Sequence, residues 1–187
     1  ALRSHALVQR LAKLGYQPDP DKLNQVFKDF KHLADELGEV NDADLVAMME
    51  GFSPSGSRWT VLRTELRTTA GRQPKQFARV ELEHPDRGRV SDIASGDGPI
   101  AAAFAAVQRI TGTDATVTAL ETRMRSTATG REFVADISID IDGTIFSGRA
   151  RGPDIVTAAI DSLLFTLDRG EAYGRADLTQ QQPAAAV

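Results

Sequence analysis

Cysteine is absent from this 187-residue sequence, which excludes a disulfide framework, a thiolate nucleophile and a cysteine-ligated metal. Only three histidines occur, and none stands in a His-x-His or His-Glu-x-x-His spacing, so we expect no metal site in this chain. No apolar run approaches the ~18 residues that cross a membrane, so we expect no membrane contact. The lack of cysteine is compatible with the cytoplasm, where we expect the protein to act.

Acidic residues outnumber basic ones, 26 to 22. The formal net charge is −4, which argues against general nucleic-acid binding, and we expect no nucleic-acid partner. Arginines do gather between residues 57 and 94, but a nucleic-acid platform needs stacking aromatics among them, and only Trp59 and Phe77 are available. We therefore interpret these arginines as the solvated outer face of a sheet; they are Arg63, Arg67, Arg79, Arg87 and Arg89.

The hydrophobic content of 41% supports a folded core, and its pattern indicates a duplication. A glycine-rich stretch turns into a small-residue helix at Gly98-Pro99, where proline suits the first helical position because its missing N–H needs no partner there. A weaker copy begins at Gly152-Pro153. Three strand-like runs precede each helix, so we predict a β-β-β-α unit that occurs twice.

The predicted elements of the two units follow the same order. In the first, strands over residues 58–69, 75–83 and 88–94 lead to a helix over 96–110. In the second, strands over 115–127, 132–141 and 144–150 lead to a helix over 153–169. Asp142-Gly143 between the last two strands predicts a two-residue hairpin turn.

The first third of the chain has helical rather than alternating periodicity. Helices are predicted over residues 4–14, 20–37 and from the capping residue Asn41 onward. The fold class is therefore α+β: a helical subdomain precedes the duplicated domain. We predict its parts as a helical subdomain (1–52), a flexible linker (53–57), two repeats (58–112 and 113–169, together 58–169) and a disordered tail (170–187).

Catalytic chemistry is hard to find in this chain. No nucleophile–base pair emerges, and the alternating Asp136, Asp140 and Asp142 fit the solvent side of a strand better than a carboxylate pair. The Gly98-Pro99 helix start lacks the Lys-Ser/Thr of a P-loop, but its N–H groups suit the carboxylate of a free amino acid. The residues by themselves indicate a binding or regulatory module.

The order of several short stretches resembles the helical linker and C-terminal regulatory domain of 2-isopropylmalate synthases, a domain that citramalate synthases share. The resemblance covers roughly residues 3–169. Its stretches are Arg3 to Tyr16, Phe27 to Asp35, Asp42 to Leu45, Gly96 to Phe104 (Gly-Asp-Gly-Pro-Ile-Ala-Ala-Ala-Phe), Gly130 to Ile141, and Asp142 to Ala159.

The resemblance implies an acyltransferase that condenses acetyl-CoA with a 2-oxo acid. Its catalytic (β/α)₈ barrel and divalent metal would lie outside this chain, so the chain alone is expected to be inactive and to hold no cofactor. The resemblance also implies a homodimer that is feedback-inhibited by an end-product amino acid, leucine first and isoleucine second. The alternatives are the regulatory domain of a citramalate or homocitrate synthase, or an amino-acid-binding or dimerisation module with no enzyme attached.

The resemblance also assigns residues to the effector pocket and, with His5, to catalysis. By its position near the chain's start His5 is interpreted first as a solvated residue. The resemblance implies a second role, because His5 lies in the linker stretch that in this family approaches a neighbouring protomer's active site. Thr122 stands where the family usually has tyrosine, so we expect weaker binding of a branched side chain. The effector-binding positions are Gly98, Ile100, Ala101, Ala119, Thr122, Ser126 and Phe133.

Overall fold

The computed structural model describes residues 2–38, 40–54 and 57–181, and these form two compact units. The strand unit holds residues 57–167, and the helical unit combines the described residues up to 54 with those from 168 onward. The predicted α+β class, with a helical N-terminal part and two β-β-β-α repeats, is confirmed. No helix among the described residues has the length and apolar character to cross a bilayer.

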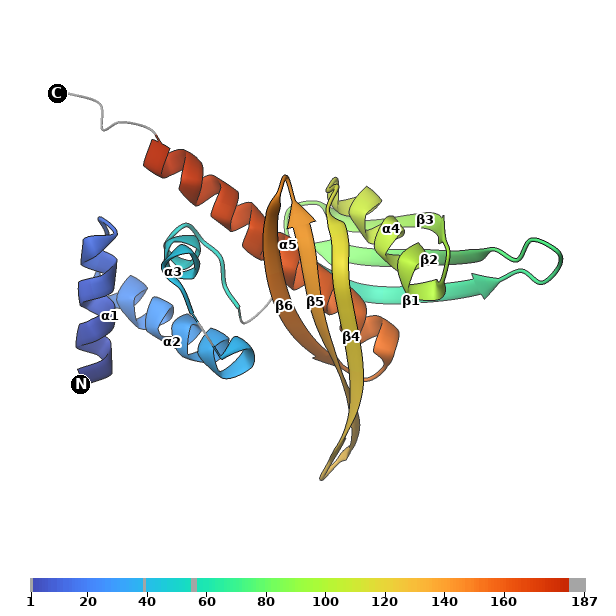
Figure 1. The fold of residues 1–187 in the computed structure, drawn as a ribbon, viewed down its shortest axis with the longest axis horizontal. Coiled ribbons are helices and arrows are strands. Elements are labelled where there is room, and N and C mark those ends of the chain that lie inside the picture. The colour runs from blue at the N-terminus through green and yellow to red at the C-terminus, as the bar shows by residue number, and fades with distance from the viewer. Residues whose placement is uncertain (1, 39, 55–56, 182–187) are drawn as a thin grey trace. The chain divides into compact units, whose positions relative to one another are not determined.

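The helical unit begins with α1 (Leu2–Lys13), α2 (Pro20–Leu37) and α3 (Asp42–Met49) (Figure 1). Asp19 caps α2 by accepting a hydrogen bond from the Lys22 amide at 2.8 Å, and Gly38 ends it with a φ of 82°. Both ends therefore lie where the sequence predicts them. Large buried side chains from all three helices form the core of this unit: Leu7, Leu11, Val26, Leu33, Leu45 and Met48.

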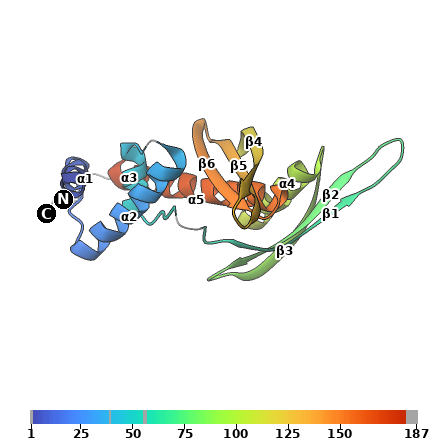
Figure 2. The ribbon, with the colours of Figure 1, turned by 90° about the horizontal axis from the view of Figure 1, so that it is seen from below.

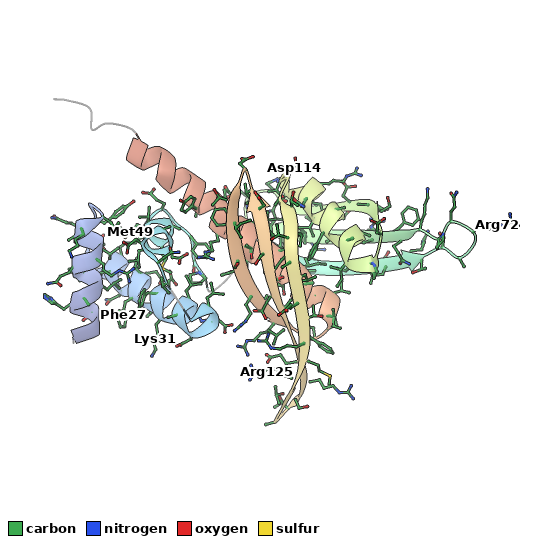
Figure 3. All side chains as sticks on the ribbon, viewed as in Figure 1. Phe27, Lys31, Met49, Arg72, Asp114 and Arg125 are labelled. Carbon is green, nitrogen blue, oxygen red and sulfur yellow. The ribbon has the colours of Figure 1, made fainter. Side chains whose placement is uncertain are left out.

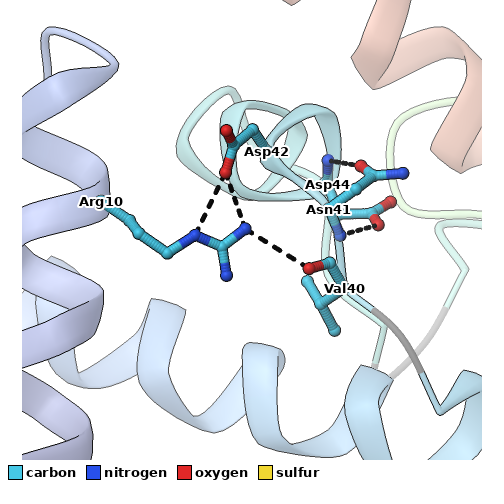
Figure 4. Close-up of polar contacts among 5 residues, drawn as sticks. All are labelled: Arg10, Val40, Asn41, Asp42 and Asp44. Carbon is cyan, nitrogen blue, oxygen red and sulfur yellow. Dashed lines mark hydrogen bonds and ion pairs between the residues drawn. The ribbon is translucent and has the colours of Figure 1, made fainter.

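Helix α3 starts with a reciprocal cap. The Asn41 side chain accepts a hydrogen bond from the Asp44 amide at 2.9 Å, and the Asp44 carboxylate accepts one from the Asn41 amide at 3.0 Å. Next to this cap, Arg10 of α1 contacts Asp42 at 2.7 Å and donates to the Val40 carbonyl at 3.4 Å (Figure 4). These contacts join α1 to the beginning of α3.

The strand unit consists of two antiparallel three-stranded sheets, each followed by a helix (Figures 1 and 2). The first sheet has the order β1-β2-β3 and the second β4-β5-β6. Alternate residues of the central strands β2 and β5 are buried toward the helices. The elements are β1 (Thr60–Thr68), β2 (Gln76–His84), β3 (Gly88–Gly96), α4 (Pro99–Thr111), β4 (Thr116–Thr127), β5 (Gly130–Ile141), β6 (Thr144–Gly152) and α5 (Ile155–Gln181).

The two repeats match each other in detail. The register shifts between Val61 and Arg63 in β1, and it shifts again between Val117 and Ala119 at the same point of β4. Each third strand ends in a glycine that its helix approaches closely. A Cβ added to Gly96 would lie 2.5 Å from the Ala102 amide nitrogen, and one added to Gly152 would lie 3.0 Å from the Ala158 nitrogen. The two repeats therefore share even the close backbone contact between the glycine that ends the third strand and the helix that follows it.

The turn between β5 and β6 is the predicted one. Asp142 has a φ of 51° and Gly143 a φ of 86°. Two successive positive φ values belong to the tight hairpin turn whose twist matches that of the flanking strands. Asp140 supports the turn, because its side chain accepts a hydrogen bond from the Gly143 amide at 2.8 Å.

The predicted tail is wrong over residues 170–181, because α5 continues to Gln181. The extension has partners in the helical unit: Arg169 Nε donates to Asp44 Oδ1 at 2.8 Å, and Ala172 is fully buried. A helix whose middle is held by packing and an ion pair propagates readily into the following turns. Residues 182–187, the rest of the predicted tail, lie outside the described residues.

Candidate functional site

The start of α4 offers backbone donors without a side-chain cap. Gly98 is the N-cap residue, with extended backbone, and in the part of the chain that the structure describes it is accompanied by no side-chain cap hydrogen bond. Ile100 is half-buried and Ala101 is exposed in this turn. The amide groups at the beginning of a helix carry partial positive charge, so they can hold a carboxylate.

The other predicted site residues lie on β4 and β5. Thr122 pairs with Ala135, which is buried on the helix-facing side, and Ser126 and Phe133 lie on that same side by the alternation of the strands. Ala119 pairs with Ser138 and faces the opposite side of the sheet. The register therefore places Thr122, Ser126 and Phe133 on the helix-facing side of the sheet and Ala119 on the opposite side.

The two groups of predicted residues do not meet within the described part of one chain. Helix α4 packs on β1, β2 and β3, and no contact between α4 and β4 is present among the described elements. Figure 3 shows Arg125 toward the free end of the β4–β5 hairpin, the same end of β4 that carries Ser126. The assignment of these residues to one effector pocket stays a prediction.

His5 is an exposed residue of α1. Its Nε2 atom lies 3.3 Å from Gln9 Nε2, one helical turn away. Among the described residues, no three His, Asp or Glu side chains are grouped closely enough to hold a metal ion. A catalytic role for His5 stays a prediction as well.

An arginine–aspartate–arginine cluster occupies the outer face of the second sheet. Asp136 contacts Arg123 on β4 and Arg149 on β6, both at 2.5 Å. Burial alone would raise the pKa of Asp136, but the hydrogen bonds and charges of Arg149 and Arg123 hold it below its usual value. Sequence reasoning assigned Asp136 to a solvent-facing side, and its two cationic partners became visible only with the strand register.

The helical unit contains a buried carboxyl that sequence reasoning missed. Asp29 is 4% exposed, and Gln25 donates a hydrogen bond to it at 3.0 Å. Burial raises the pKa of Asp29 above its usual value, although the hydrogen bond from Gln25 and the charge of Lys22 oppose this. The signal was present in the spacing, since position 29 continues the helical stripe of Val26 and Leu33.

A family model described as the LeuA allosteric (dimerisation) domain matches residues 39–170. The chain belongs to this family. The match includes both β-β-β-α repeats and α3, and it ends inside α5. The resemblance inferred from the short sequence stretches is thus confirmed, and the chain is a regulatory domain of the 2-isopropylmalate synthase type.

Several curated relatives named 2-isopropylmalate synthase are similar to this LeuA-type chain. The protein from Rhodopirellula baltica is 32% identical over 168 residues, which are 88% of this chain and 31% of that relative. The protein from Heliobacterium modesticaldum is 30% identical over 167 residues, covering 88% of this chain and 32% of the relative. The chain therefore spans about a third of the length of the relatives it matches.

Proposed function

We propose that this chain is the effector-binding and dimer-forming part of a 2-isopropylmalate synthase-like acyltransferase, and that its effector is leucine or, failing that, isoleucine. The observation that carries the proposal is the uncapped start of α4 in a member of the allosteric domain family. The amides near Ile100 and Ala101 would hold the α-carboxylate of the amino acid. A helix-facing surface at Thr122 and Phe133 would receive the aliphatic side chain.

A second copy of the chain completes this pocket in our proposal. Since α4 does not contact β4 within the described part of one chain, the helix start of one protomer and the β4–β5 surface of its partner would meet across a two-fold interface. Amino-acid binding then depends on the dimer, and the effector stabilises one dimer arrangement. By thermodynamic linkage, the factor by which the effector changes the affinity for substrate equals the factor by which substrate changes the affinity for the effector.

Calorimetric titration of leucine, isoleucine and valine into this chain tests the effector. We expect leucine to bind, and Ala101→Trp to abolish binding because the indole would fill the space beside the first-turn amides. Ala12→Trp is the control, since Ala12 is exposed on α1, which belongs to the helical unit, whereas α4 belongs to the strand unit. If none of the three amino acids binds at millimolar concentration, the domain serves assembly rather than feedback.

The dimer and the enzymatic part need separate measurements. Sedimentation at micromolar concentration should show a dimer, and a monomer at every concentration would contradict the shared pocket. The acyl-transfer chemistry and its divalent metal would reside in a barrel outside this chain. Incubation of the chain with acetyl-CoA, a 2-oxo acid and Mg²⁺ should therefore release no free CoA.

A further inference from the structure

The outer face of the first sheet carries a small group of residues that neither repeat helix covers. Arg67 on β1 lies opposite Phe77 on β2, and Arg79, two residues along β2, lies between Glu65 and Ile93. Residues opposite or diagonal to each other on one face of a sheet are close enough for their side chains to touch. These five residues, with Thr69, line a hollow of about 290 Å³.

The second sheet shows what the same positions look like when their charges are satisfied. By the matching registers, Arg67, Phe77, Arg79 and Ile93 correspond to Arg123, Val134, Asp136 and Arg149. There the central aspartate binds both arginines, and Val134 beneath them is fully buried. The second repeat thus supplies its own carboxylate to this place.

The first repeat has no carboxylate at that central position; the carboxylate in its hollow is that of Glu65 on β1. An arginine, Arg79, stands at the aspartate position, and Glu65 is already held by Arg63 at 2.6 Å. Among the described residues, neither Arg67 nor Arg79 forms an ion pair. The apolar part of the hollow is exposed to solvent. Ile93 is 50% exposed, whereas Val134 on the matching face of the second sheet is fully buried.

We propose that this hollow binds a small carboxylic acid with an apolar body, whose carboxylate takes the place that Asp136 fills in the second sheet. The two guanidinium groups recognise the carboxylate through charge-assisted hydrogen bonds. Phe77 and Ile93 contact the apolar body. The site is separate from the amino-acid pocket at α4, because it lies on the sheet face that α4 does not cover.

The test uses isovalerate as the probe and backbone amide NMR of β1–β3 as the readout. Isovaleramide has the same apolar body without the charge, and acetate has the charge without the body. We expect isovalerate to shift the Phe77 and Ile93 amides with at least tenfold higher affinity than either control. Leucine titrations run in parallel report on the proposed effector site alone.

Two matched variants locate the site. Arg79→Asp recreates the arrangement of the second sheet, so Arg67 becomes paired and isovalerate affinity should fall at least tenfold. Arg89→Asp makes the same charge change on the same face, but Arg89 lies outside the hollow and is 70% exposed beside Glu83. Arg89→Asp should change the affinity less than twofold, and leucine binding should be unchanged in both variants.

Equal affinity for isovalerate, isovaleramide and acetate, or equal effects of the two variants, would overturn the proposal. Shifts at Phe77 and Ile93 that grow with protein concentration without any added acid would also overturn it, because another copy of the chain would then fill the hollow. Loss of leucine binding with isovalerate binding intact would contradict the proposed effector while leaving this site standing.

Discussion

The ion pair between Arg169 and Asp44 is the contact whose removal should cost the helical unit most. The two side chains are 13% and 4% exposed, and their residues lie 125 positions apart in the sequence. Removing one partner of a buried pair leaves an uncompensated charge, which typically costs ~3–5 kcal/mol. Asp44 keeps its hydrogen bond from the Asn41 amide in an Arg169→Met variant, so we expect the lower end of that range, about 3 kcal/mol.

Arg10→Met is the matched control, because Arg10 and Asp42 form an ion pair in the same unit that is 38% and 63% exposed. Exposed pairs contribute about 0–1 kcal/mol. The assay is native-state hydrogen exchange of the α3 amides as a function of urea, which reports the free energy of opening the helical unit. If Arg169→Met costs no more than Arg10→Met, the burial argument is refuted.

Two further predictions concern a backbone contact and a titration. Gly96→Ala should destabilise the strand unit by about 1–3 kcal/mol, because the new Cβ meets the Ala102 backbone. Gly98→Ala has open space around the new Cβ, so in thermal unfolding it should cost less, about 0.5 kcal/mol, for the poorer N-cap of α4 alone. Asp29 has a raised pKa, so its contribution to stability falls as pH rises through that pKa. Asp29→Asn should therefore remove this fall, so that stability rises more steeply with pH on the acid side and the protein is more stable at pH 7, and an unchanged curve would contradict this.

Local signals in the sequence were sufficient to predict most of the elements. Asp19 and Gly38 define both ends of α2, and Asp142-Gly143 defines a turn, because each of these residues acts on backbone within a few positions. The duplicated β-β-β-α order follows from a change in periodicity. These predictions needed no knowledge of which distant segments meet.

Apart from the buried Asp29, whose helical spacing was a local signal, the features that escaped prediction depend on distant partners. The helix at 170–181 persists beyond the predicted end, where Arg169 finds Asp44 in the helical unit. Asp136 forms ion pairs with two arginines, whereas Arg79 at the matching position of the first sheet forms no ion pair among the described residues. This difference depends on strand register, which residue composition does not determine. For the same reason, the arginines of residues 57–94 could be interpreted from the sequence only as the solvated outer face of a sheet.

The part of α5 from residue 168 onward belongs to the helical unit, and two of its residues have fixed places there. Arg169 forms an ion pair with Asp44, and Ala172 is fully buried. Each residue of an α-helix turns the following side chains by about 100°. One residue inserted between Arg169 and Ala172 would therefore turn Ala172 by about 100° relative to Arg169, so the two side chains could not both keep their places. This stretch of α5 should accordingly tolerate a change in length poorly, unlike the surface hairpins at Arg72 and Asp142, where a single added residue alters only a turn.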